Sequence, residues 1–270
     1  MTIAIDWNLA RALLEWQLEL GVTEALCADP VDRFAQPEGV AEVVPDQTVP
    51  DAERAPDRPH VMRIADTGPD PIAEAQRLAQ SARDLPALAE ALADFPHCEL
   101  RRGARSCVFA DGNPNARVMI IGEGPGADED RIGKPFVGRA GQLLDQMLAA
   151  IGLDRHSPDP ARSVYIANTV PWRPPGNREP TREELAMLKP FLLRHVELVQ
   201  PSLLVLVGNV ACDAMLGQRG ILRLRGQWTQ ALGLPVLPML HPAYLLRTPE
   251  AKRETWADLL SLKAKMRALP

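Results

Sequence analysis

Four short apolar runs, each followed by a segment of helical periodicity, dominate the second half of the chain. The runs cover residues 118–121, 164–168, 203–207 and 235–240, and the helical segments cover residues 141–151, 181–199, 209–217 and 250–266. Buried strands that alternate with helices form parallel sheets with both faces covered and right-handed crossovers. The pattern predicts an α/β fold, a three-layer α/β/α sandwich around a central four-stranded, mainly parallel sheet.

The N-terminal part of the chain has a different character. Residues 1–28 contain one segment with helical spacing, and residues 29–70 are rich in proline and acidic residues without a sustained period. The second composition is typical of a disordered linker. We expect an N-terminal helix over 1–28, a linker over 29–70 and a folded domain over 71–270. The helix either packs on that domain or binds a protein partner.

Charge and cysteine usage narrow the class of protein. Residues 1–92 hold 7 Lys and Arg against 17 Asp and Glu, a net charge of −10, whereas the remaining residues hold 23 against 18, a net of +5. The mildly basic part is compatible with phosphate contacts. The four cysteines form no CxxC pair, and the chain shows neither a secretory signal nor a membrane-spanning run. We expect a cytoplasmic monomer without metal or membrane contact.

Unusual polar residues follow three of the four runs. Gly122-Glu123-Gly124-Pro125-Gly126 follows the first, Asn168 begins a proline-rich loop that contains Arg173 and Arg178, and His241-Pro242 follows the last. Ligands of open parallel sheets bind at the carboxyl ends of the strands. The glycine-rich loop is neither GxGxxG nor a P-loop, so a nucleotide cofactor is not indicated.

Each of these residues also has a structural alternative. Glu123 could cap a turn, Phe136 could belong to the core, Asn168 could satisfy strand-end backbone groups, and His241 could be a structural histidine. Their convergence at one edge of the sheet favours a binding site. An aromatic face, an amide, a histidine and a carboxylate suit a flat, hydrogen-bonding ring such as a nucleic-acid base taken out of its stack.

Three segments carry a specific family resemblance. GEGPGADEDRIGKPFVGRAGQLLDQML, NTVPWRPPGNREPTREE and HPAYLLR, in this order, resemble the family 4 uracil-DNA glycosylases over roughly residues 85–265. The resemblance implies hydrolysis of the N-glycosidic bond of uracil in DNA, which leaves an abasic site. It places Phe136 against the flipped uracil, Asn168 at its Watson–Crick edge, His241 at O2 of the departing anion and Glu123 at the sugar cation or its attacking water.

The resemblance also implies roles for the surrounding residues. The glycines Gly122, Gly124 and Gly126 would leave room for base and sugar. Single-Asp branches of the superfamily carry a carboxylate at the position of Gly124, so the catalytic role falls on Glu123, with Asp128 or Asp130 as alternatives. The residues implied at the DNA are Arg173, Arg178, Pro242, Leu245, Leu246 and Arg247, with Leu245 or Leu246 as a wedge in the duplex.

One family feature is missing. Family 4 members bind a [4Fe-4S] cluster through four cysteines, and the matching positions here are Phe95, Cys98, Trp172 and Leu188. A cluster of this kind needs its full set of thiolates. We therefore expect no iron–sulfur cluster and no other cofactor. We expect an apolar plug in its place, with Cys98 as an ordinary buried thiol.

The resulting hypothesis is a monofunctional glycosylase that removes uracil, with other deaminated bases as an extension, from single- or double-stranded DNA. Apart from Lys134, the three motifs contain no lysine for β-lyase chemistry, and residues 171–181 contain no histidine for covalent capture of the abasic site. The alternatives are a non-catalytic uracil- or abasic-DNA-binding protein, a repair-partner module, and a hydrolase of small nucleotides.

Overall fold

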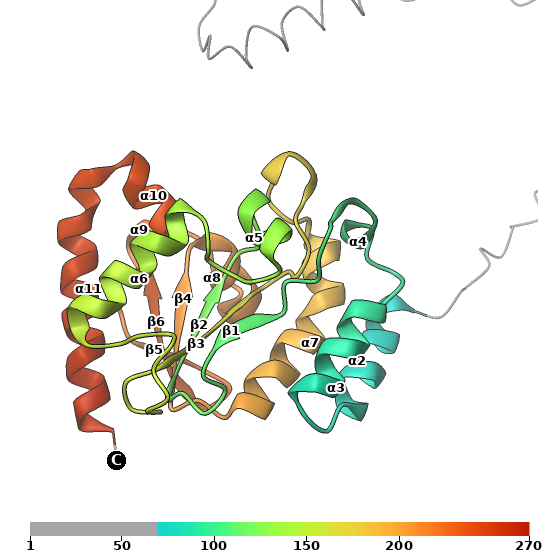
Figure 1. Cartoon of the computed structure of the whole chain (residues 1–270), viewed down its shortest axis with the longest axis horizontal. Coiled ribbons are helices and arrows are strands. Elements are labelled where there is room, and N and C mark those ends of the chain that lie inside the picture. The colour runs from blue at the N-terminus through green and yellow to red at the C-terminus, as the bar shows by residue number, and fades with distance from the viewer. Residues whose placement is uncertain (1–69, 270) are drawn as a thin grey trace, which may run out of the picture. The chain divides into compact units, whose positions relative to one another are not determined.

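Four parallel strands, buried along nearly their whole length, form the centre of the computed structural model, which describes residues 70–269 (Figure 1). They are β2 (Val118–Gly122), β3 (Val164–Asn168), β4 (Leu203–Val207) and β6 (Leu234–Met239). Their order in the sheet is β3-β2-β4-β6, with Gly122 paired to Asn168. The expected α/β class and the parallel centre are confirmed, and two strand ends that carry candidate site residues lie side by side.

The sheet that the described residues form has six strands, so the expected number of four was too low. Two three-residue edge strands run antiparallel to their neighbours: β1 (Ala110–Gly112) pairs with β3, and β5 (Thr229–Ala231) pairs with β6. Neither has a buried face, and three residues are too few to show an alternating pattern. Only their hydrogen-bonded pairing with β3 and β6 in the structure identifies them as strands.

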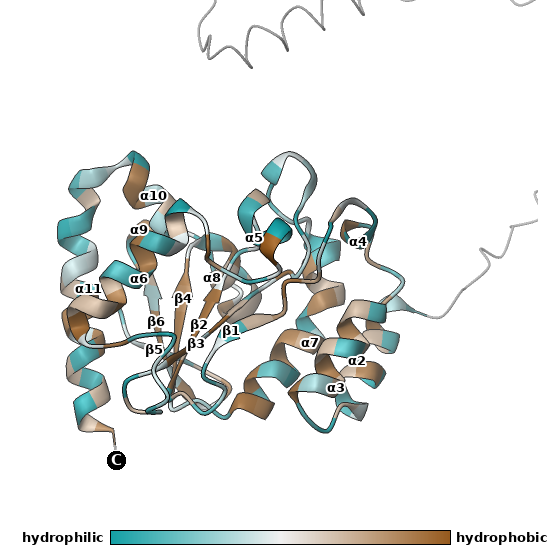
Figure 2. Cartoon of the chain, viewed as in Figure 1, coloured by the Kyte–Doolittle hydropathy of each residue, from teal (hydrophilic) through white to brown (hydrophobic). Residues whose placement is uncertain are grey.

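Helices cover both faces of the sheet, as the apolar runs predict. On one face, α6 (Arg139–Ile151) and α11 (Lys252–Ala268) pack over Val118 and Ile120. On the other, α7 (Arg182–Val199) and α8 (Asn209–Leu216) pack over Met119 and Ile121. Successive strand residues point to opposite faces, which is why both sets are apolar. Figure 2 shows mostly apolar central strands between helices that carry both polar and apolar residues.

A third hydrophobic cluster lies beside α7, away from the sheet (Figure 1). There α2 (Pro71–Ser81) and α3 (Leu85–Asp94) pack against α7 and against the loop that follows β3. We call it the Trp172 cluster, and the members used below are Phe95, Cys98, Trp172, Leu188 and Phe191.

Short helices fill the connections. The sequence pattern did not indicate them, and they are α4 (Leu100–Gly103), η1 (Pro175–Asn177), η2 (Pro249–Ala251), α9 (Ile221–Leu224), α5 (Ala127–Ile132) and α10 (Pro242–Arg247). Two of them, α5 and α10, shape the candidate site. No helix between residues 70 and 269 is long and apolar enough to cross a membrane. The predicted N-terminal helix and linker lie outside the described residues.

Candidate active site

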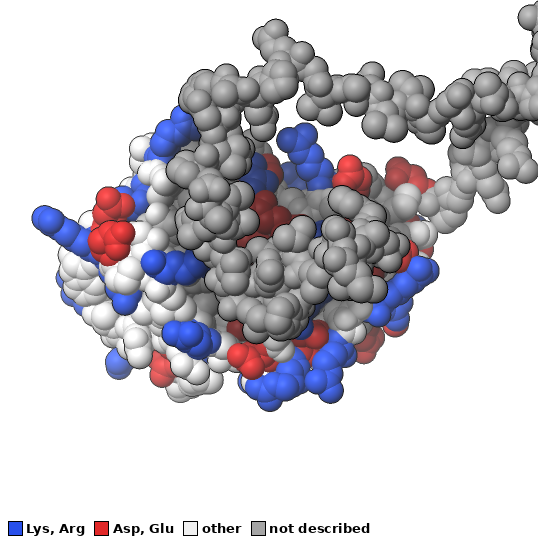
Figure 3. Space-filling view, turned by 90° about the horizontal axis from the view of Figure 1, so that it is seen from above, with Lys and Arg blue, Asp and Glu red and all other residues white. Residues whose placement is uncertain are grey.

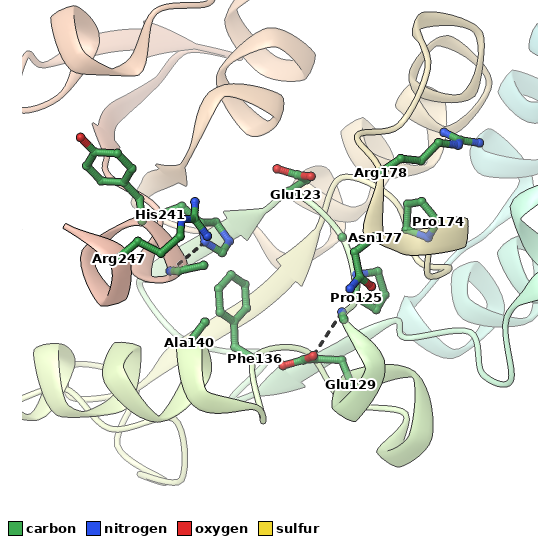
Figure 4. Close-up of a pocket in the computed structure, with 14 residues that line it drawn as sticks. Glu123, Pro125, Glu129, Phe136, Ala140, Pro174, Asn177, Arg178, His241 and Arg247 are labelled. Atoms are coloured by element: carbon green, nitrogen blue, oxygen red, sulfur yellow. Dashed lines mark hydrogen bonds between the residues drawn. The ribbon is translucent and has the colours of Figure 1, made fainter. Parts of the chain in front are cut away.

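A pocket of about 460 Å³ opens at the carboxyl ends of the strands (Figure 4). Its wall combines the loop after β2, the segment before α6, the loop after β3 and the start of α10. The structure therefore brings together residues that the sequence places more than a hundred positions apart. Of the expected site residues, those that line it are Glu123, Gly124, Gly126, Phe136, Arg178, His241 and Arg247.

The loop after β2 is glycine-rich because its neighbours approach the backbone closely. A Cβ on Gly122 would lie 2.5 Å from the ring of Phe136 and 2.6 Å from Oδ1 of Asn168. A Cβ on Gly124 would lie 2.7 Å from Cγ2 of Val170. Such distances exclude any side chain, so the glycines let an aromatic ring and an amide close over the strand end.

Phe136 has an unusual backbone. Its φ is +54°, in the left-handed region that non-glycine residues seldom adopt. The ring is almost fully buried, and its centroid lies 5.5 Å from that of the His241 ring at an interplanar angle of 31°. The two rings thus face a common space from different elements, as Figure 4 shows.

Asn168 ends β3 next to Gly122. Thr169 bonds the Gly122 carbonyl through its backbone N–H and its hydroxyl, and this fixes the two strand ends against each other. The Asn168 amide itself is buried, and neither its oxygen nor its nitrogen has a hydrogen-bond partner within the described part of the chain. Leaving a buried amide unpaired costs free energy of folding, about 1–3 kcal/mol. The amide is not needed by the strand end, so the structural alternative for Asn168 finds no support.

His241 is the N-cap residue of α10. Its Nδ1 accepts the backbone N–H of Ala243 at 3.2 Å, so in the neutral ring the proton sits on Nε2. Withdrawal of the ring from water, with the positive charge of Arg247 as a smaller cause, lowers the pKa of His241 to about 4. At neutral pH the ring is an uncharged donor through Nε2.

Glu123 stands on the opposite side of the pocket from Phe136 (Figure 4). Burial, followed by repulsion from Glu179, raises the pKa of the Glu123 carboxyl above its usual value, and the positive charge of Arg219 opposes the shift. The other acidic candidates are occupied elsewhere. Asp130 is buried and accepts the backbone N–H groups of Arg105 and Ser106, and the exposed Asp128 pairs with Arg131.

The residues expected at the DNA divide into two groups. Leu246 and Arg247 are exposed at the rim, on α10. Leu245 and Pro242 are buried, and Leu245 belongs to the core beneath α6 and α11. Of the two candidate wedge residues, only Leu246 is therefore exposed, and contact of Leu245 or Pro242 with DNA stays a prediction. On the short helix α10, Leu245 points into the core and Leu246 points to solvent. The sequence alone did not show which of the two leucines is exposed.

Arg173 and Arg178 are largely committed to intramolecular bonds. Arg178 makes a two-pronged ion pair with Glu184 at 2.7 and 2.9 Å and points away from the pocket centre in Figure 4. Arg173 donates to Oδ1 of Asn177. Where Figure 3 leaves the described surface uncovered, both basic and acidic side chains are visible. Of the three arginine side chains, Arg247 alone has neither a hydrogen bond nor an ion pair with another described residue.

Two residues outside the predicted site bind the backbone of the loops that form it. Glu129 accepts the backbone N–H groups of Gly126, Val137 and Gly138, which joins the glycine loop to the Phe136 segment. Arg155 is buried and donates to the carbonyl oxygens of Pro135 and Phe136. Glu129 stands three residues after Gly126, the spacing of a capping box, and that signal could have identified it. Arg155 had no signal in the sequence.

The positions matching the cysteines of family 4 do come together, in the Trp172 cluster. Phe95, Trp172 and Leu188 are at most 2% exposed, and the Phe95 ring packs edge-on against Phe191 at 5.3 Å. Burial raises the pKa of the Cys98 thiol to about 11. Phe95, Trp172 and Leu188 fill the volume and carry no thiolate or other metal-ligating atom, so these residues do not fit an iron–sulfur cluster. Between residues 70 and 269, no three His, Cys, Asp or Glu side chains form a group that could hold a metal ion.

Comparison with known proteins places the chain in a family. Residues 109–260 match the model of the uracil DNA glycosylase superfamily. The chain is 38% identical over 172 residues to the type-4 uracil-DNA glycosylase of Thermotoga maritima, covering 62% of this chain and 86% of that protein. It is 36% identical over 172 residues to the type-4 enzyme of Archaeoglobus fulgidus, covering 60% and 82%. A type-5 uracil-DNA glycosylase of Pyrobaculum aerophilum is 34% identical over 162 residues, covering 55% and 71%. The chain belongs to the uracil DNA glycosylase superfamily.

Proposed function

We propose that this protein is a uracil-DNA glycosylase that hydrolyses the N-glycosidic bond of uracil in DNA and leaves an abasic site for base excision repair. The type-4 and type-5 relatives support the activity. The single structural observation that carries it is the unpaired, buried amide of Asn168 beside a closely packed aromatic ring. A polar group kept without an internal partner is explained by a ligand that supplies one.

Uracil matches that amide. Its edge offers the N3–H donor next to the O4 acceptor, and an asparagine amide offers an acceptor and a donor in the same spacing. Phe136 would stack on the ring, and the flat faces of base and phenyl group suit each other. Because the amide atoms are shielded from water in the free protein, the base reaches them only with a local side-chain movement.

The leaving group is handled by His241. As the bond between C1′ and N1 breaks, its electron pair moves onto the uracil ring and O2 gains negative charge. Nε2–H of the neutral His241 ring donates to that oxygen, and the Nδ1 bond to Ala243 holds the ring in this tautomer. With a pKa of about 4, the ring is neutral at physiological pH, so it stabilises the anion by a hydrogen bond without first carrying a proton of its own.

Glu123 completes the reaction on the sugar side. Its carboxylate faces the pocket and can stabilise the positive charge that builds at C1′. It can also accept a proton from the water whose oxygen forms the new bond to C1′, and that proton then balances the uracil anion. The products are free uracil and an abasic sugar, and none of the described residues that line the pocket is a lysine that could carry the reaction on to strand cleavage.

Contacts to the DNA are assigned to the exposed part of α10. Leu246 is the apolar side chain that would fill the space left by the flipped base, and Arg247 would contact a phosphate. Arg173 and Arg178 stay in the proposal as secondary phosphate contacts, because their intramolecular partners already take much of their donor capacity.

The proposed enzyme works without an iron–sulfur cluster or another cofactor. The apolar side chains of the Trp172 cluster support this, because three of the four positions that match the family 4 cysteines lack a thiol that could bind iron. Iron determination on protein purified without oxygen tests it, and stoichiometric iron would contradict it. The monomeric state, the cytoplasmic location and a protein partner for residues 1–28 stay predictions.

Uracil release from defined oligonucleotides tests the function. Single- and double-stranded oligonucleotides with one uracil are incubated with the protein, and abasic sites are cleaved with alkali. A thymine oligonucleotide controls for substrate, and His241→Ala, purified in parallel, controls for host glycosylases. We expect cleavage by the wild type at the uracil only. Tight binding of the uracil strand without cleavage at stoichiometric protein would establish the non-catalytic binding protein instead.

A further inference from the structure

One buried arginine holds the backbone on which the base-stacking ring stands. Arg155, in the loop after α6, is 4% exposed. Its Nη1 donates to the Pro135 carbonyl and its Nη2 to the Phe136 carbonyl, both at 2.9 Å. Its Nε donates to Asp145 at 2.8 Å, and Nη1 also approaches Asp111 at 3.3 Å. The planar guanidinium of Arg155 thus binds two adjacent peptide carbonyls at once.

Two carboxylates on different elements compensate the positive charge of Arg155. Asp145 lies on α6 and Asp111 on β1, and Asp111 also pairs with Lys134 at 3.1 Å, immediately before Pro135. These cations hold the pKa of the Asp111 carboxyl below its usual range, against the opposing effect of burial. Arg155, Asp111 and Asp145 therefore form an ion-pair network around a buried guanidinium, and we call this network the Arg155 clamp.

The segment that Arg155 binds, residues 135–138, has a strained backbone conformation that needs support from its surroundings. Phe136 has φ +54°, and its carbonyl lies so close to α6 that a Cβ on Gly141 would stand 1.9 Å from the oxygen. A strained backbone persists only when its surroundings over-determine it. Here the carbonyls of residues 135 and 136 are held by Arg155, and the N–H groups of residues 137 and 138 by Glu129.

We propose that Arg155 is a positioning residue for base capture, which acts through the backbone of Phe136. The clamp keeps the 135–138 segment fixed, so that the Phe136 ring alone responds to an entering base by rotating about its side-chain bonds. Without the clamp, Phe136 returns to an unstrained backbone conformation and its ring leaves the space beside His241 and Asn168. Arg155 itself does not line the pocket. The inference rests on the proposed glycosylase activity.

A double-mutant cycle separates this role from general stabilisation. The variants are Arg155→Met, Phe136→Leu and their combination, and the readout is kcat/KM for a uracil-containing single strand. If Arg155 acts through the ring, Arg155→Met lowers kcat/KM at least tenfold with Phe136 present and less than twofold in the Phe136→Leu background. An equal loss in both backgrounds would overturn the proposal and leave Arg155 with a structural role.

Arg194→Met is the matched control. Arg194 also donates to a backbone carbonyl, that of Ala82, but ties α7 to the end of α2 far from the pocket. We expect kcat/KM within twofold of the wild type. If Arg155→Met does not fold, Asp145→Asn takes its place in the cycle, because Asp145 is half exposed and its exchange weakens the clamp from outside. The same loss in the two backgrounds would again contradict the proposal.

A binding measurement distinguishes failure of this inference from failure of the proposed function. Strands carrying 2′-fluoro-2′-deoxyuridine or thymidine are titrated against each variant, and the ratio of their dissociation constants reports the base pocket without turnover. A wild type that neither cleaves nor prefers the uracil analogue would remove the function and, with it, this inference. A wild type that does both, together with an unchanged ratio in Arg155→Met, would overturn the role of Arg155 alone.

Discussion

The pocket and the Trp172 cluster flank the same loop after β3, yet they treat polar groups in opposite ways. At the pocket and the adjoining end of β3, the Asn168 amide has no partner among the described residues, Phe136 is held at positive φ, and Glu123 and His241 have shifted pKa values. In the Trp172 cluster, positions that hold cysteines in family 4 carry large apolar side chains in close contact. The first region holds polar groups at a cost in stability, whereas apolar packing in the second contributes stability.

The comparison predicts that changes in the two regions have reciprocal effects. Substitutions in the pocket should lower activity and spare the free energy of unfolding. Substitutions in the cluster should do the reverse.

Glu123→Gln should lower the single-turnover rate of uracil release by about 10²–10⁴-fold, because it removes the charge that faces the sugar. The raised pKa of Glu123 places the acid limb of the wild-type pH–rate profile above the ordinary carboxyl value of 4.5. The rate falls as the pH drops through that limb, and the limb should be absent in the variant. A variant with an unchanged rate and profile would remove Glu123 from the chemistry.

Leu188→Ala should have its effect on stability. Removing a fully buried leucine costs about 2–5 kcal/mol, which lowers the unfolding midpoint of a domain of this size by about 4–20 °C. At a temperature where both proteins are folded, the rate of uracil release should stay within about threefold of the wild type. Loss of activity without loss of stability would make the cluster part of the site.

His195→Gln should flatten the dependence of stability on pH. His195 is buried on α7 against Phe109 and bonded to the Tyr165 hydroxyl, and burial lowers its pKa to about 3 from 6.5. Below pH 6.5 the unfolded chain binds a proton that the folded protein does not, so the free energy of unfolding falls progressively as the pH drops toward 3. Denaturant titrations at several pH values measure the slope, and an unchanged slope in the variant would contradict the assignment.

Arg247→Gln should have the smallest effect. If Arg247 contacts one phosphate, the slope of log K against log salt for a uracil-containing strand should decrease in magnitude by about 0.7–0.9. Arg162→Gln, an exposed arginine just before the amino end of β3, is the control and should leave the slope unchanged. A decrease of equal size in both variants would point to a general charge effect rather than a contact on α10.

The sequence was informative where apolar patterning and chain order decide the structure. The four parallel strands, the main helices and the gathering of Glu123, Phe136 and His241 at one sheet edge followed from apolar runs and from where each run ends. Asn168 was found in the same way, but its unpaired state depends on three-dimensional surroundings. No local pattern encodes which partners a buried amide lacks.

The remaining features depend on tertiary contacts. Arg155 reaches carbonyls nineteen and twenty positions earlier in the chain, and no spacing rule connects a loop arginine to them. Leu245 and Leu246 are equally apolar, and only the orientation of α10 decides that the first is buried. The edge strands β1 and β5 are too short to have a pattern of their own. In each case tertiary contacts, and not the local sequence, determine where the residue or strand lies.

The central claim is that the Asn168 amide is left unpaired inside the protein because it binds uracil. Asn168→Ala tests it when single-turnover uracil release and the unfolding midpoint are measured on the same preparation. We expect the rate to fall by about 100-fold, since a two-bond base contact is lost, while the midpoint stays the same or rises because an unpaired buried amide is removed. A wild-type rate, or a marked loss of stability with the rate per folded molecule unchanged, would contradict the claim.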